Sequence, residues 1–119
     1  MKANIPREQE IAIYDYINLI LMVEVLENKA KKGTNVDKPI GIVLDNLAKI
    51  KKYLHVNQIK VHPVVVDSDG LFVQYNFTCR VNGGFAEGEY RFWRSALTMQ
   101  LNKKMKLLQQ GEKIIESDV

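Results

Sequence analysis

The chain contains very little cysteine and histidine, the side chains on which many enzymes and metal sites depend. Cys79 is the single cysteine among the 119 residues, and the histidines are His55 and His62. One cysteine excludes an internal disulfide and fits a reducing compartment, so we expect a cytoplasmic protein. No Cys-x-x-Cys or His-x-x-x-His spacing is present, and no glycine-rich phosphate loop joins a predicted strand to a helix. The sequence therefore predicts no enzymatic activity, no metal and no cofactor.

Long hydrophobic runs are also lacking. The most apolar stretch, Ile11 to Leu26, contains Asp15, Asn18 and Glu24. A transmembrane helix needs about 20 mostly apolar residues, so this stretch is too short and too polar to cross a bilayer alone. We expect no membrane partner and predict a buried helix over about residues 7–32.

This predicted helix has more apolar surface than the rest of so small a domain can cover. Its apolar residues lie on several sides rather than in one stripe, so several sides need cover. We expect a second copy of the chain to cover the surplus and to form a homodimer. The predicted interface consists of four residues of this helix: Ile13, Ile17, Ile20 and Leu21.

The remaining periodicity predicts one α+β domain, and 46% hydrophobic with 26% charged residues is an ordinary globular composition. Two further segments repeat apolar residues at helical spacing, and three alternate apolar with polar residues. Pro63 cannot donate to a ladder, so its strand should lie at an edge, and Cys79 should point inward. The predicted order is ααβββα, a three-stranded antiparallel meander packed by one face on helices. After the first helix it consists of a helix over about 37–54, strands over about 59–66, 71–81 and 85–92, and a helix over about 94–110.

The net charge of +3 is unevenly distributed along the chain. Residues 29–60 contain eight basic and two acidic side chains, and residues 91–110 contain five basic and no acidic ones. If the helices predicted in these two regions are neighbours, their cations form one surface able to contact several phosphates. Otherwise the lysines only solvate exposed helix faces. The candidate nucleic-acid contacts are Lys49, Lys52, Arg94, Lys103 and Lys106.

The stretch FTCRVNGGFAEGEYR (residues 77–91) resembles the second and third strands of the double-stranded RNA-binding domain. From the helix at 37–54 onward, the predicted order is also similar to the αβββα order of that family. The resemblance implies binding of duplex RNA, with phosphates held at the start of the last helix. There the family's lysine-rich sequence is replaced by Phe-Trp-Arg-Ser (residues 92–95), in which Arg94 is the only basic residue, and the loop at 67–70 is short and acidic.

Two interpretations of function follow from these patterns. Tyr90, Phe92 and Trp93 either form a stacking platform for bases or plug the core at a strand-to-helix junction, and we favour the core. The leading interpretation is a small interaction or regulatory protein that acts as a homodimer, with another protein as a further candidate partner. The alternative is a nucleic-acid-binding module that uses the lysines of the second and third predicted helices.

Overall fold

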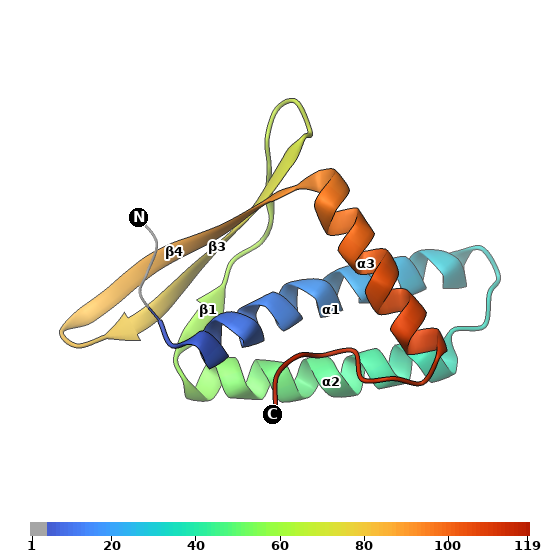
Figure 1. Cartoon of the computed structure of the whole chain (residues 1–119), viewed down its shortest axis with the longest axis horizontal. Coiled ribbons are helices and arrows are strands. Elements are labelled where there is room, and N and C mark those ends of the chain that lie inside the picture. The colour runs from blue at the N-terminus through green and yellow to red at the C-terminus, as the bar shows by residue number, and fades with distance from the viewer. Residues whose placement is uncertain (1–4) are drawn as a thin grey trace.

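The computed structural model describes residues 5–119, which form three helices and a four-strand antiparallel sheet (Figure 1). This confirms the predicted α+β class, and the ends of the helices and of the two long strands lie within two residues of the predicted ones. The elements are α1 (Arg7–Lys31), α2 (Asp37–Val56), β1 (Ile59–Val61), β2 (Val65–Val66), β3 (Phe72–Val81), β4 (Gly84–Trp93) and α3 (Arg94–Gln109).

The first predicted strand, residues 59–66, is divided into β1 and β2. Both pair antiparallel with the same side of β3, through Ile59 opposite Cys79 and Val66 opposite Val73. Pro63 lies in the gap between them, where its missing N–H and fixed φ interrupt the ladder. β3 is therefore the central strand, with β1 and β2 along one side and β4 along the other.

Side-chain alternation along β3 defines the two faces of the sheet. The inner face carries the buried residues Val73, Tyr75, Phe77 and Cys79. Cys79 is only 2% exposed, which confirms the inward register predicted for this strand. The helices pack on this inner face, whereas the outward-facing residues of β4 are all exposed.

Gly88 of β4 lies directly opposite Phe77 of β3. A Cβ atom at Gly88 would lie 2.3 Å from Cζ of the Phe77 ring, far inside van der Waals contact. Only glycine lets the ring lie flat across the neighbouring strand, so this residue sets how closely β4 approaches the core.

Helix α1 is covered on several sides within a single copy of the chain. Ile13 and Ile17 are fully buried, and Ile20 and Leu21 are partly buried against the core. The prediction that Ile13 and Ile17 form a dimer interface was therefore wrong. Its premise failed because both side chains already belong to the core of a single copy, in which α1 packs against α2 and α3.

The C-terminal segment after α3 runs back over the helices, as Figure 1 shows in red. Its Ile114 and Ile115 are buried, and the backbone N–H groups of Glu116 and Ser117 each donate to the Asp15 carboxylate at 2.9 Å. Asp15 is itself buried on α1, so these two hydrogen bonds satisfy a carboxylate that would otherwise be costly to bury. The tail thus fills the side of α1 that the sheet and α2 leave open.

Candidate interaction site on the open side of the sheet

One end of the outer sheet face carries an exposed aromatic cluster. Phe72 and Trp93 are opposite each other on β3 and β4, with their ring centroids 4.5 Å apart. The Arg91 guanidinium lies 4.4 Å from the Phe72 centroid and donates a hydrogen bond to the Asp67 carboxylate. Trp93 is 58% exposed. We call these four residues the aromatic end.

Trp93 does not plug the core, which was the interpretation favoured from sequence. β4 continues through Trp93 and α3 begins at the next residue, so strand alternation directs this side chain outward. Tyr90 and Phe92 point inward, where their rings stack with centroids 6.3 Å apart. The three aromatic residues therefore do not share one face and cannot form one stacking platform.

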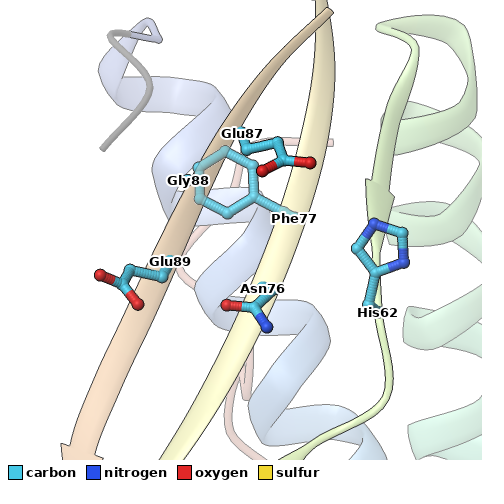
Figure 2. Close-up of a pocket in the computed structure, with 6 residues that line it drawn as sticks. All are labelled: His62, Asn76, Phe77, Glu87, Gly88 and Glu89. Atoms are coloured by element: carbon cyan, nitrogen blue, oxygen red, sulfur yellow. The ribbon is translucent and has the colours of Figure 1, made fainter. Parts of the chain in front are cut away.

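The middle of the outer face is polar. His62 Nε2 and Thr78 Oγ1 lie 2.8 Å apart, and the Gln74 side-chain amide donates to Asn76 Oδ1 at 2.8 Å. Figure 2 shows a shallow pocket in this region, with Asn76 of β3 between the His62 segment and β4. The pocket measures about 330 Å³, and its lining consists of His62, Asn76, Phe77, Glu87, Gly88 and Glu89.

The hydrogen-bond pattern of β3 shows which groups of β4 face outward. The N–H of Arg94 donates to the Leu71 carbonyl, and the N–H of His62 donates to the Asn76 carbonyl, both at 2.8 Å. Odd-numbered residues of β3 therefore bond toward β4, and even-numbered residues of β3 bond toward β1 and β2. Because Leu71 is opposite Arg94, the β4 residues bonded to β3 are the even-numbered ones.

The backbone groups of the odd-numbered residues of β4 consequently point away from the sheet. We call them the β4 edge: Phe85, Glu87, Glu89, Arg91 and Trp93. Within residues 5–119, no backbone or side-chain group forms a hydrogen bond with the backbone of this edge. The side chains of these five residues lie on the outer face. Strand β4 therefore presents exposed backbone polar groups beside exposed charged and aromatic side chains.

The two edges of the sheet differ in how they are protected. The opposite edge consists of two short strands interrupted at Pro63, and β1 also contacts α2. Short strands and proline are common means of preventing unwanted strand pairing. Strand β4 is 10 residues long, contains no proline, and carries only Glu87, Glu89 and Arg91 as charged residues. The β4 edge is the side of the sheet on which a further strand can be added.

The five candidate nucleic-acid contacts are distributed along α2 and α3. Helices α2 and α3 meet near the start of α2 and the end of α3, where Pro39, Ile42, Met105 and Leu108 line one hollow. At 1.5 Å per residue, Lys49 and Lys52 lie about 10 and about 15 Å along α2 from Ile42, and Arg94 lies about 16 Å along α3 from Met105. Lys103 and Lys106 are exposed on α3 between these ends.

Buried tyrosines are the groups with shifted pKa values on the inner face. Burial raises the pKa of Tyr90 to about 12, with a further contribution from the Glu10 carboxylate that the Arg7 guanidinium partly opposes. Burial, followed by the Glu24 carboxylate, also raises the pKa of Tyr75. Both phenols therefore stay protonated at neutral pH, so neither serves as a general base there.

Comparison with known proteins yielded no relatives. No protein-family model matches the chain, and neither a curated protein nor a solved structure matches it. Among residues 5–119, no group of three or more His, Cys, Asp or Glu side chains is placed to hold a metal ion. No helix in this described part is long and apolar enough to cross a membrane.

The β4 edge was missed at the level of sequence, although a signal for it is present. A meander of three strands leaves its last strand unpaired on one side unless another segment returns to it. Here the chain passes directly from β4 into α3, so no later strand is available to pair with it. Side chains alternate between the two faces along a strand, so the odd-numbered residues from Phe85 to Trp93 are those whose side chains lie on the open face.

Proposed function

We propose that this protein is a small non-enzymatic interaction protein that acts as a homodimer, with the β4 edge and the adjoining outer face as the homotypic contact. The observation that carries the proposal is the β4 edge itself. On this edge, five residues of one strand direct outward N–H and C=O groups that no group in residues 5–119 pairs, beside the exposed aromatic rings of Trp93 and Phe85.

An open strand of this length favours association because a second strand satisfies its backbone groups. Each hydrogen bond contributes a net of about 0.5–1.5 kcal/mol, and association itself costs about 4–15 kcal/mol in lost freedom. The side chains beside the ladder therefore decide whether binding is stable. Phe85 and Trp93, which are 71% and 58% exposed, are the large aromatic residues that interface cores favour.

The non-enzymatic part of the proposal is supported by the positions of the reactive side chains. Cys79 is buried on the inner face, where a thiol is usually a small hydrophobic group. The His62 imidazole contacts Thr78 on the opposite face, so these residues do not form a nucleophile–base pair. A buried, unpaired thiol also supports the proposed cytoplasmic location.

Light scattering across a concentration series tests the proposal. We expect about twice the 13.7 kDa mass of one chain at tens of micromolar. Glu89→Pro should be monomeric yet folded, because its N–H points away from β3 and is not needed for the internal ladder. The matched control is Glu89→Ala, which keeps that N–H and should still dimerise.

A mass of 13.7 kDa for the wild type up to about 100 µM contradicts the homodimer. Salt-sensitive binding of that monomer to duplex RNA or DNA, lost on Lys103→Ala with Lys106→Ala, would favour the nucleic-acid alternative instead. The slope of log affinity against log salt should then fall by nearly one for each lost phosphate contact.

A further inference from the structure

We infer that the partner strand is β4 of a second copy, paired antiparallel about a two-fold axis through Glu89. This inference rests on the homodimer proposed above and specifies its register. In this arrangement Glu87 is opposite Arg91 of the other copy, and Phe85 is opposite the other copy's Trp93.

Symmetry restricts how two β4 edges can meet. A two-fold axis pairs residue i with a residue j of the other copy such that their numbers have a constant sum. Edge-facing groups find partners only when both residues are odd-numbered, because the even-numbered ones are already bonded to β3. Antiparallel pairing satisfies both conditions at once, and the axis then passes through a residue of β4.

The number of edge-facing residues that find a partner distinguishes the registers. An axis through Glu89 engages all five residues of the β4 edge on each copy. An axis through Gly88 or Tyr90 engages four, because one end of β4 then extends past the last residue of the other strand. Axes further from the centre engage three or fewer.

Charge complementarity favours the same register over the axis through Gly88. With the axis at Glu89, two Glu–Arg pairs form between positions 87 and 91 of the two copies, and one like-charged Glu89 pair remains on the axis. With the axis at Gly88, Glu87 is opposite Glu89 twice and no Glu–Arg pair forms. Opposite charges directly across a ladder are stabilising and like charges are destabilising.

The remaining alternative, an axis through Tyr90, also forms two Glu–Arg pairs but leaves both aromatic residues without aromatic partners. In that register Trp93 is opposite Glu87, and Phe85 extends beyond the end of the other strand. With the axis at Glu89, by contrast, the ring of Phe85 lies beside the aromatic end of the other copy. Aromatic cross-strand pairs contribute to sheet stability, so the exposed aromatic residues at both ends of β4 fit this axis.

Among residues 5–119, β4 pairs only with β3, so its other side is open to this pairing. In Figure 1, β4 lies on the side of β3 away from β1 and α2, and the β3–β4 hairpin projects beyond the helices. The two-fold axis is perpendicular to the plane of the sheet, so the outer faces of the two copies lie on the same side of the dimer. The two sheets would then become one continuous sheet with a shared outer surface.

Cysteine cross-linking reads the register directly. In a hydrogen-bonded antiparallel pair the Cα atoms lie about 5.5 Å apart, within the roughly 4.4–6.8 Å range of disulfides. Glu89→Cys should therefore form a covalent dimer with oxidised glutathione as the oxidant. Glu87→Cys alone and Arg91→Cys alone should not, because each residue would lie about 14 Å from its own copy, but a mixture of the two should cross-link.

Each outcome of this experiment has a distinct meaning. A wild type that is monomeric in light scattering overturns both the proposed function and this register. A wild-type dimer whose Glu89→Cys variant does not cross-link overturns the register and leaves the homodimer intact. Cross-linking of a Glu89→Cys and Arg91→Cys mixture, without self-linking at 89, places the axis at Tyr90 and also overturns the inference. Wild-type protein is the control, because its buried Cys79 should not cross-link.

Two charge variants provide an independent readout without cysteine. Glu89→Gln removes the like-charged pair on the axis and should tighten the dimer on the order of two- to five-fold. Glu87→Arg puts two arginines opposite each other and should weaken the dimer, and adding Arg91→Glu should restore most of the loss. An unchanged dissociation constant for both single variants would contradict the register.

Discussion

The packing of Gly88 against Phe77 gives a sharp test of the inner face, through the change Gly88→Ala. A new Cβ would lie 2.3, 2.6 and 3.0 Å from three atoms of the Phe77 ring, where contact normally occurs at about 3.5–4.0 Å. The ring has little freedom to move away, because Phe77 is 1% exposed and the Tyr90 ring centroid lies 5.6 Å from its own.

The expected loss of stability in Gly88→Ala is the difference between two opposing effects. Overpacking a filled core costs about 1–3 kcal/mol, and the lower entropy of an unfolded alanine offsets about 0.4–1 kcal/mol. Gly88→Ala should therefore lower the free energy of unfolding by about 1–2 kcal/mol, or Tm by about 4–8 °C for a domain of this size. Urea unfolding followed by circular dichroism measures the change.

Gly84→Ala is the matched control in the same strand, because a Cβ there would meet nothing within 4 Å. It should leave stability unchanged or slightly raised. The loss from Gly88→Ala should also shrink in a Phe77→Leu background, where the clashing ring is absent. Equal stabilities of Gly88→Ala and Gly84→Ala would refute the close approach of Phe77 to β4.

Three other predictions concern the outer face, the tail and the core tyrosines. Trp93→Ala should change monomer stability by less than about 1 kcal/mol, since its ring is 58% exposed, while weakening the dimer measured by light scattering. Asp15→Asn should cost about 1–3 kcal/mol in urea unfolding, because an amide offers only one of the two oxygens that accept the N–H groups of Glu116 and Ser117. The raised pKa of Tyr90 stabilises the fold below its ordinary pKa of 10.0, and this stabilisation should be lost as pH rises from 10.0 to about 12. Between pH 10 and pH 12 the free energy of unfolding should therefore fall less in Tyr90→Phe than in the wild type. An equal fall in both proteins would contradict the raised pKa of Tyr90.

The regular part of the fold was predictable because local periodicity determined it. The alternation along β3 gave both its ends and the inward position of Cys79, since a one-residue slip would expose every apolar side chain. The ends of the helices followed in the same way from apolar spacing. Pro63 was correctly placed at an edge, but the sequence did not show that it would divide the strand.

The errors occurred where the outcome depended on tertiary contacts. Ile13 and Ile17 are fully buried in the core of a single copy, and apolar spacing alone cannot reveal which tertiary contacts cover them. Trp93 lies at the junction of strand and helix, so a shift of one residue in the end of β4 decides whether it points inward or outward. Whether the basic residues of α2 and α3 form one surface likewise depends on how these helices pack, which no local pattern specifies.

Residue-resolved amide hydrogen exchange of β4 tests the central claim most directly. The N–H groups of the even-numbered residues bond to β3 within one copy, so they should be protected at every protein concentration. Those of Glu87, Glu89 and Arg91 should exchange fast below the dissociation constant and become protected above it, because no group in residues 5–119 bonds to them and a second strand would. If these three amides exchange fast at concentrations where the even-numbered ones are protected and the protein is dimeric, the homotypic contact does not lie along the β4 edge.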